Sequence, residues 1–307
     1  MPPRVAAIVL AYNGREVTLQ ALRSLRRMTY PSFDLVVVDN GSTDGSAAAI
    51  GGAFPEVALL RAEANLGAAG GANLGIRWAL ERGYDYLLLL NNDIEVDPRM
   101  LEELVAAAEG DSRIGAVGPK AYYHGDPERI WSAGGRIRFR EAVTRERGQG
   151  EIDRGQYDRD VEVDYLNGCA VLVRRRAFEE VGLWDPLFHL AVEDADWCLR
   201  ARRAGYRCLY AHRARLWHMV SHTTGPYRAA KTYQTGRSTA IFVRRHAGLA
   251  QWASFLLFYA AAFPAAYLRE LPRRNQGAAV AKLRGVLAGF RVPLTAPPGA
   301  ARPAAAR

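Results

Sequence analysis

The chain has 307 residues, of which 49% are hydrophobic, enough for one large α/β domain or two smaller ones with a sizeable core. Its formal net charge of +9 favours anionic partners, such as phosphorylated substrates, nucleic acid or an anionic membrane surface. No aromatic residues are interleaved with the arginine clusters, which argues against an RNA-stacking platform, and the three cysteines have no zinc-site spacing. A reduced, cytosolic interior is therefore expected, and the N-terminus does not have the pattern of a signal peptide.

Strand and helix patterns alternate through the first 120 residues. Strands are expected at 5–10, 34–38, 57–60, 86–90 and 114–117, and helices at 16–27, 46–50, 65–82 and 98–108. This alternation is typical of βαβ units on a parallel sheet. We therefore predict an α/β fold with a mostly parallel, Rossmann-like sheet flanked by helices.

The pattern beyond residue 120 is less regular. An irregular, charged excursion is expected over the active face, followed by further strands and helices. The expected elements are some β-structure at 137–143, a strand at 163–173, helices at 178–181 and 194–204, and a last strand at 207–210.

The C-terminal part has a different composition. Residues 247–268 carry no charge, and their number is near the ~20 that span a bilayer. Aromatic residues recur at helical spacing, Pro264 interrupts the run and arginines flank it, which favours a helix lying in the membrane interface. A basic amphipathic helix follows, with Leu287 on its apolar side and Lys282 on its basic side. Both helices could instead pack on the domain.

The run of four leucines at 87–90 ends in Asn91, Asn92 and Asp93. A buried strand that carries a carboxylate at its C-terminal tip reaches the edge where open α/β sheets bind ligands. Asp39 ends the second expected strand and would lie on the same edge. One acid could accept from a base N–H while the other holds a cation that bridges phosphates. By itself, the Asn-Asn-Asp sequence is equally consistent with a simple turn.

Two loops near this edge have informative compositions. Asn40-Gly41 is a strong hairpin signal, but possible helix N-cap residues follow it, so we favour a strand-to-helix loop. The glycine-rich segment 65–73 would let the backbone approach a ligand closely. It does not match the dinucleotide-binding pattern.

Two further motifs carry titratable groups. Glu193, Asp194 and Asp196 open an expected helix, where one or two acids would suit the helix dipole. Three acids beside a tryptophan suggest in addition a partly buried carboxylate acting as a base. His218 and His222 are four residues apart. A single histidine is most often structural, but one of these could complete a metal site begun at the central strand.

In their order and spacing, these motifs resemble the family 2 glycosyltransferases of the GT-A fold. The Asn-Asn-Asp form and the Trp-His-x-x-Ser-His ending resemble the rhamnosyltransferase-type branch that builds bacterial cell-surface polysaccharides. The resemblance covers about residues 5–224 and implies a catalytic domain over 1–225. A helical, membrane-associated region over 226–295 and a disordered, proline- and alanine-rich tail over 296–307 would follow.

The resemblance implies inverting sugar transfer from a nucleotide-sugar, either dTDP- or UDP-linked, to an acceptor hydroxyl. The acceptor would be a glycan or a polyprenyl-diphosphate-linked precursor, reached from the cytoplasmic face of the bacterial membrane, and nucleic acid is not an expected partner. Asp194 would be the base, supported by Glu193 and Asp196. Asp93 and His218 would hold Mg or Mn. The nucleotide-sugar pocket would comprise Ala11, Tyr12, Asn13, Asp39, Asn40, Asn65, Gly67, Gly70, Asn73, Asn91 and Asn92.

One position departs from the family's common DxD pattern, because Asn91 replaces the first acid. We therefore expect weak metal binding in the absence of nucleotide. Three other functions compete with sugar transfer. They are a metal-dependent nucleotidyltransferase, a basic nucleic-acid-binding module and a catalytically silent scaffold, which the intact acids disfavour.

Overall fold

The computed structural model describes residues 1–140, 142–220 and 229–299, and a mixed β-sheet forms its centre. The strands lie in the order β10-β12-β6-β11-β4-β1-β2-β3, with β5 paired to β12 and β7 paired to β6. A separate hairpin pairs β8 with β9. The strand bounds are β1 (Val5–Ala11), β2 (Phe33–Asp39), β3 (Ala58–Arg61), β4 (Tyr86–Asn91), β5 (Ile94–Val96), β6 (Ile114–Tyr123), β7 (Asp126–Ser132), β8 (Gly135–Ile137), β9 (Thr144–Glu146), β10 (Val161–Glu162), β11 (Ala170–Arg174) and β12 (Arg207–His218).

The direction of the strands divides the sheet into two parts. One part consists of β3, β2, β1 and β4, which run parallel to one another. The other part contains β6 and β12, which are also parallel to each other. Between these two parts, β11 is antiparallel to both β4 and β6. The predicted Rossmann-like sheet flanked by helices is confirmed, and the sheet is mixed because β11 and the outer strands β5, β7 and β10 pair antiparallel.

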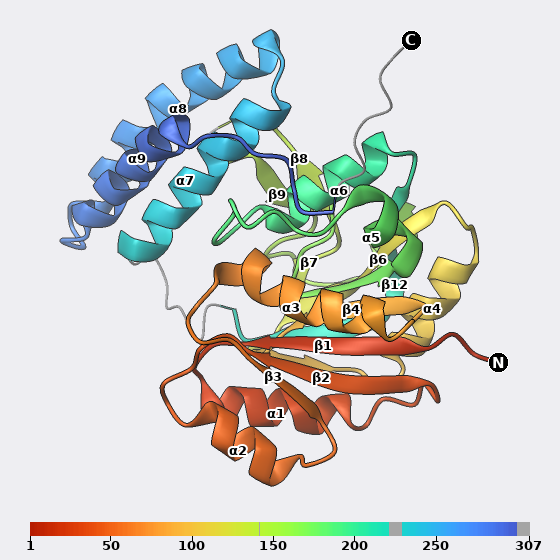
Figure 1. Cartoon of the computed structure of the whole chain (residues 1–307). Coiled ribbons are helices and arrows are strands. Elements are labelled where there is room, and N and C mark those ends of the chain that lie inside the picture. Colours follow the sequence, from red (N-terminus) through yellow and green to blue (C-terminus); the bar gives the residue numbers. More distant parts are fainter. Residues whose placement is uncertain (141, 221–228, 300–307) are drawn as a thin grey trace.

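Helices cover both faces of the sheet (Figure 1). Side chains of α3, α5 and α6 pack on one face, and those of α1, α2 and α4 pack on the other. The helix bounds are α1 (Arg15–Leu25), α2 (Ser46–Ala53), α3 (Gly67–Glu81), α4 (Met100–Glu109), α5 (Arg175–Val181), α6 (Glu193–Arg203), α7 (Ala229–His246), α8 (Leu249–Glu270) and α9 (Gln276–Arg291).

The leucine run in β4 explains how the sheet is held between these helices. Leu87 and Leu89 belong to the core on one face, whereas Leu88 and Leu90 belong to the core on the other. Alternate strand residues point to opposite faces, so a strand covered on both sides must be apolar at every position. The run therefore places Asn91 and the residues after it at the C-terminal edge of a fully covered strand.

The second half of the chain differs from the sequence prediction in several elements. The strand expected at 163–173 is wrong, because β10 ends at Glu162 and β11 begins only at Ala170. The intervening chain leaves the sheet, and the Gly168 N–H donates to the Asp194 carboxylate over 2.8 Å. β12 is longer than expected and extends to His218, and β5 and β7 had not been predicted. α7 lies within the C-terminal region that had been expected to be helical.

The three C-terminal helices form a layer beside the sheet (Figure 1). α7 and α9 approach so closely that a Cβ atom on Gly236 would lie 2.2 Å from the Lys282 carbonyl oxygen. A Cβ on Gly285 would lie 2.0 Å from the Tyr233 carbonyl oxygen, so this contact requires glycine on both helices. The buried face of α9 is therefore its small-residue face, and Leu287 on the expected apolar side is 49% exposed.

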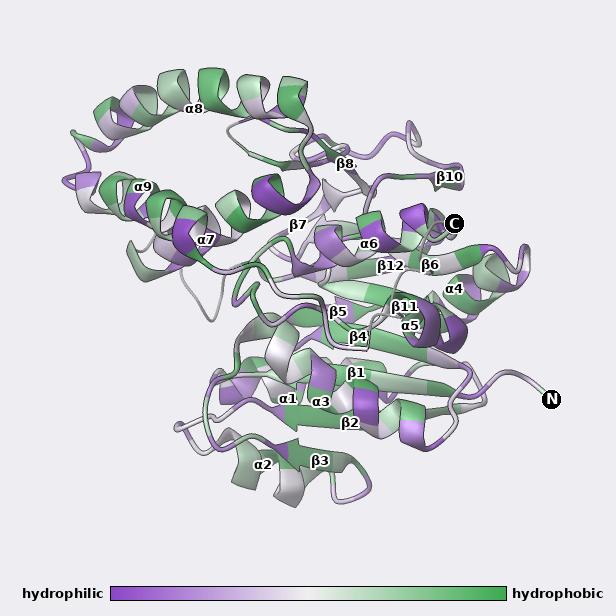
Figure 2. Cartoon of the chain, turned by 45° about the horizontal axis from the view of Figure 1, so that its top comes forward, coloured by the Kyte–Doolittle hydropathy of each residue, from purple (hydrophilic) through white to green (hydrophobic). Residues whose placement is uncertain are grey.

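α8 has one face toward the protein and one toward solvent. Trp252 stacks on Phe290 of α9 with the ring centroids 5.6 Å apart, and Phe255 is buried. Leu256 and Leu257 are exposed by 55% and 70%, and the ribbon of α8 is apolar along much of its length (Figure 2). Within the described residues, α8 is the one helix long and apolar enough to cross a membrane.

The described end of the chain is also attached to the domain. The Leu183 N–H donates to the Pro298 carbonyl over 2.9 Å, within the segment that had been expected to be disordered. Residues 300–307 of that segment, and His222 of the histidine pair, lie outside the described residues. The three cysteines are buried and form no disulfide.

Candidate active site

A cavity of about 940 Å³ opens at the C-terminal edge of the sheet. Its lining includes residues that are far apart in the sequence, from β1, β4, β9, the start of α6, the end of β12 and the C-terminal helices. The sequence-predicted site residues that line it are Tyr12, Asn13, Asn40, Asn65, Gly67, Asn91, Asn92, Asp93, Glu193, Asp194 and His218.

Asparagine side chains fix the loops around one part of this cavity. Asn40 accepts from the Leu66 N–H over 3.0 Å and donates to the Gly67 carbonyl over 3.1 Å. Asn92 donates to the Thr18 hydroxyl over 2.8 Å. These bonds join the loops after β2 and β3 to each other and the turn after β4 to α1. A ligand in the cavity thus meets preformed loops.

Gly67 occupies a position that only glycine suits. Its φ is +76°, and a Cβ atom there would lie 2.5 Å from Nδ1 of His189. The next N–H, of Ala68, donates to the His189 carbonyl over 2.8 Å. The glycine-rich loop therefore packs directly against the segment that leads to α6.

Asp93 and His218 meet at the ends of two different strands. Nε2 of His218 lies 3.0 Å from Oδ1 of Asp93, and both side chains are largely buried. Nδ1 of His218 is buried and has no hydrogen-bond partner among the described residues. Trp131 contacts the imidazole edge-on, with a centroid distance of 4.4 Å.

This pair fits a divalent cation that is shared with a ligand. A carboxylate and an imidazole are suitable donors, and Mg²⁺ in proteins is often held by one or two carboxylates together with substrate phosphates. The described residues contain no cluster of three or more His, Cys, Asp or Glu side chains that could hold a metal alone. Asp93 and His218 would therefore need a ligand or water to complete the coordination.

Glu193, which is buried, and Asp194, which is half-buried, form an acid pair at the start of α6. Oδ2 of Asp194 accepts from the Gly168 N–H over 2.8 Å, and Oδ1 accepts from the Ala195 N–H over 2.7 Å. Burial raises the pKa of both carboxyls, and the charge of Asp194 adds to the rise at Glu193. Oε2 of Glu193 is buried without a hydrogen-bond partner in the described part of the chain. A carboxylate with a raised pKa is a better proton acceptor than an ordinary one.

Asp196 has a different environment, although it is only two residues away. It is fully buried and accepts from Arg200 and from Nε2 of His246, each over 2.8 Å. Burial by itself would raise the pKa of Asp196, but the hydrogen bond from His246 and the charge of Arg200 lower it overall. Asp196 is not part of the cavity lining and instead joins α6 to α7.

Four other expected pocket residues lie outside the cavity lining. Asn73 is buried, donates to the Trp184 carbonyl over 2.7 Å and accepts from the Trp184 N–H over 3.2 Å, so both ends of its amide hold the fold together. Ala11 and Asp39 are buried at their strand ends, and the Asp39 carboxylate accepts from a backbone N–H over 3.0 Å. Gly70 packs within α3 against Leu66.

Glu146 is a cavity residue that the sequence analysis did not identify. It accepts from the Tyr165 hydroxyl over 2.5 Å, from Asn167 over 2.9 Å, and from the Ser132 hydroxyl. Burial raises the pKa of Glu146, and its charge contributes to the raised pKa of Asp194. Glu146 lies in an irregular, charged part of the sequence, where nothing distinguished it from the surface acids around it.

The C-terminal helices supply a second unexpected wall of the cavity. Lys231, Tyr233, Gln234, Thr235 and Thr239 of α7 line it, together with Lys282 of α9. Sequence reasoning had placed Lys282 on the outer, basic side of an amphipathic helix. The close approach of α7 and α9 turns it toward the cavity.

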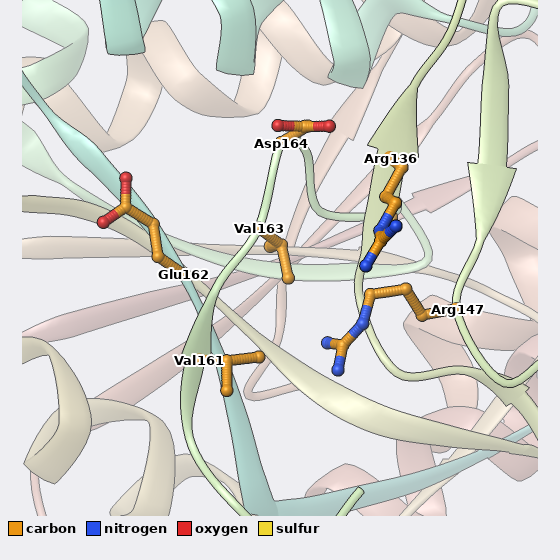
Figure 3. Close-up of a pocket in the computed structure, with 7 residues that line it drawn as sticks. Arg136, Arg147, Val161, Glu162, Val163 and Asp164 are labelled. Atoms are coloured by element: carbon orange, nitrogen blue, oxygen red, sulfur yellow. The ribbon is translucent and has the colours of Figure 1, made fainter.

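A smaller hollow of about 260 Å³ lies beside the β8–β9 hairpin (Figure 3). Its charged groups already serve the fold. Arg147 donates to the Ala133 carbonyl over 2.7 Å and packs over Tyr157, and Asp164 pairs with Arg202 at 3.0 Å. We therefore assign no ligand to this hollow.

Known proteins resemble the chain in both sequence and fold. The family model described as glycosyl transferase family 2 matches residues 6–182. An N-acetylglucosaminyl-diphospho-decaprenol L-rhamnosyltransferase of Mycobacterium tuberculosis is 29% identical, over 78% of this chain and 84% of that protein. A poly-beta-1,6-N-acetyl-D-glucosamine synthase of Staphylococcus epidermidis is 24% identical, over 72% of this chain and 51% of that protein.

Solved structures with low sequence identity share the fold. A mannosyltransferase from Pyrobaculum calidifontis, in complex with GDP-Man and Mn²⁺, has a TM-score of 0.59 at 18% identity and covers 94% of this chain and 88% of its own. GalNAc-T7 with UDP, GalNAc and Mn²⁺ has a TM-score of 0.62 at 16% identity, over 78% of this chain and 48% of its own. With its GT-A fold and with a family match over more than half of its length, the chain belongs to glycosyl transferase family 2 and is a glycosyltransferase.

Proposed function

We propose that the enzyme transfers a sugar, with inversion, from a nucleoside-diphosphate donor to a hydroxyl of a polyprenyl-diphosphate-linked acceptor. One observation carries the proposal: a single cavity contains both the Asp93–His218 pair and the half-buried Asp194 carboxylate. A direct displacement needs a base for the incoming hydroxyl and neutralisation of the leaving diphosphate. The two clusters supply these two requirements separately.

Asp194 is the proposed base. The acceptor hydroxyl gives its proton to the Asp194 carboxylate as its oxygen forms the new bond to the anomeric carbon. The bond from that carbon to the phosphate oxygen breaks, and the nucleoside diphosphate leaves with the electron pair. The N–H groups of Gly168 and Ala195 hold the carboxylate in position, and Glu146 adds a negative charge that favours its taking up the proton.

Asp93 and His218 are the proposed ligands for Mg²⁺ or Mn²⁺. When bound, the cation would neutralise negative charge on the leaving diphosphate. Two solved structures of the same fold contain Mn²⁺, which supports this proposal. Because Asn91 and Asn92 carry no charge, Asp93 is the carboxylate that would hold the cation at this strand end, and affinity should depend on the nucleotide.

The donor is proposed to be dTDP-rhamnose, since the rhamnosyltransferase of M. tuberculosis is similar over most of both chains. A UDP-sugar would present the same base edge to the pocket. Tyr12 is 37% exposed and lines the cavity, so its ring is available to contact a base or sugar.

The enzyme is proposed to act on the cytoplasmic face of the bacterial membrane. α8 exposes Leu256, Leu257 and Leu268 to solvent, and Arg273 and Arg274 follow it. Exposed apolar side chains next to arginines suit a surface of anionic lipid. This arrangement would hold the cavity near a lipid-linked acceptor.

A transfer assay tests the proposal. Purified enzyme with Mn²⁺, dTDP-rhamnose and a diphosphate-lipid-linked N-acetylglucosamine acceptor should give a product whose new linkage has the inverted configuration by NMR. Asp194→Asn should keep nucleotide binding but lose at least ~10²–10⁴-fold in kcat, the usual contribution of a general base. Glu128→Gln, which changes an exposed acid outside the cavity, is the control. Near-normal activity of Asp194→Asn would rule out the assigned base.

A further inference from the structure

The wall that α7 and α9 contribute to the cavity is held against the catalytic part of the chain. The Ser238 hydroxyl donates to the Leu190 carbonyl over 2.8 Å, and Arg237 donates to the Leu187 carbonyl over 2.7 Å. The segment with these two carbonyls leads directly into Asp194. The middle of α7 is thus fixed beside the proposed base.

Lys282 lies on this side of the cavity. Its backbone carbonyl is where α9 approaches Gly236 of α7 most closely, and Gly236 is two residues before Ser238. The backbone of Lys282 thus lies beside the part of α7 that bonds to the segment before Asp194. Lys231 lies near the start of α7 and close to the Asp93–His218 pair. Burial lowers the pKa of Lys231, and the negative charge of Asp93 acts against this shift.

The surroundings of Lys282 suit a phosphate group. Thr239 and Tyr233 line the same wall with hydroxyl groups, and the ammonium group of a lysine is a compact, three-donor charge that binds phosphate well. α8, which packs on α9, exposes Leu256 and Leu257, on which a lipid chain could lie. A cation that lines the same cavity as the proposed base, on a helix that packs against the exposed leucines of α8, suits an acceptor whose sugar is joined to a lipid through a diphosphate.

We propose that Lys282 binds the diphosphate of the lipid-linked acceptor, at a subsite distinct from that of the donor diphosphate. The proposal rests on the proposed function and extends it, since it specifies how the acceptor is held. The contact would place the sugar of the acceptor toward Asp194 and its lipid toward α8 and α9.

A binding experiment tests this subsite without any need for turnover. The full chain is titrated with geranylgeranyl diphosphate, with and without saturating dTDP and Mn²⁺, and with geranylgeraniol to measure the contribution of the lipid alone. Lys282→Gln should weaken diphosphate binding about tenfold or more and leave geranylgeraniol binding unchanged, because a charge-assisted hydrogen bond is lost. Lys282→Arg should restore most of the affinity. Arg284→Gln removes the same charge from an exposed position on α9 and is the matched control.

The outcomes separate this subsite from the donor site. Binding that persists in the presence of dTDP and depends on Lys282 but not on Arg284 supports the proposal. Competition between dTDP and geranylgeranyl diphosphate, or equal affinity of Lys282→Gln and the wild type, overturns it. Failure of dTDP to bind would count against the proposed function. The affinity of the Lys282 variants for geranylgeranyl diphosphate would still test the acceptor subsite.

Discussion

Replacing Asn73 by alanine should destabilise the enzyme without weakening nucleotide binding. The side chain joins α3 to the backbone of Trp184 through buried bonds of 2.7 and 3.2 Å. Alanine would leave one N–H and one carbonyl of Trp184 without these partners. Each such loss costs ~1–3 kcal/mol, so we expect the free energy of unfolding to fall by about 2–4 kcal/mol.

Asn91→Ala provides the comparison, because Asn91 lines the cavity at the end of β4. This variant should lose affinity for dTDP with Mn²⁺ and change the unfolding free energy by less than ~1 kcal/mol. Urea denaturation measures the stability of each variant, and calorimetry below its unfolding transition measures nucleotide affinity. If Asn73→Ala lost nucleotide affinity while keeping its stability, Asn73 would be a ligand-binding residue and our structural assignment would be wrong.

Three further predictions concern the acid pair, the metal and α8. Because burial raises the folded-state pKa of Glu193, the folded state retains its proton longer than the unfolded state, and wild-type stability should fall as pH rises from about 4.5 through the raised pKa. Glu193→Gln should remove this loss, so the assignment would be contradicted if the melting temperatures of the two proteins changed with pH in parallel from pH 5 to 9. EDTA should abolish transfer and Mn²⁺ restore it, while calorimetry should find only weak Mn²⁺ binding without nucleotide; full activity in EDTA would exclude the metal role. Leu256→Ser with Leu257→Ser should reduce sedimentation with anionic vesicles several-fold at unchanged melting temperature, and Leu287→Ser gives an independent test on α9.

The parts of the fold that the sequence predicted are those fixed by local pattern. The run Leu87 to Leu90 predicts a strand covered on both faces, and such a strand places Asp93 at the ligand-binding edge of the sheet. The loops after β2 and β3 were likewise recognisable from their composition. In each case the pattern of a short segment is enough to predict where the strand ends and where the polar residues after it lie.

The residues that the sequence did not reveal depend on distant contacts. Glu146 reaches the cavity because Tyr165 and Asn167 bond to it, and both lie in a segment that had been expected to be a continuous strand. Lys282 reaches it because glycines let α7 and α9 approach closely. Helical periodicity alone favoured the larger apolar side chains of α9 as its buried face, whereas the observed contact buries its glycines and alanines.

The acids at the start of α6 show why a motif by itself cannot assign a proton acceptor. Asp194 and Asp196 lie on the same helix, but their pKa values shift in opposite directions, because burial dominates at Asp194 whereas the partners of Asp196 outweigh its burial. Asp196 is surrounded by arginine and histidine side chains, so it remains charged and holds α7 in place. Burial and the nearby charge of Glu146 raise the pKa of Asp194, although the backbone N–H groups that bond to it act in the opposite direction. The affinity of Asp194 for a proton is therefore raised where it lines the cavity. α7 also carries part of the cavity wall. Asp196, which does not line the cavity, therefore still holds in place the surface against which we propose that the acceptor binds.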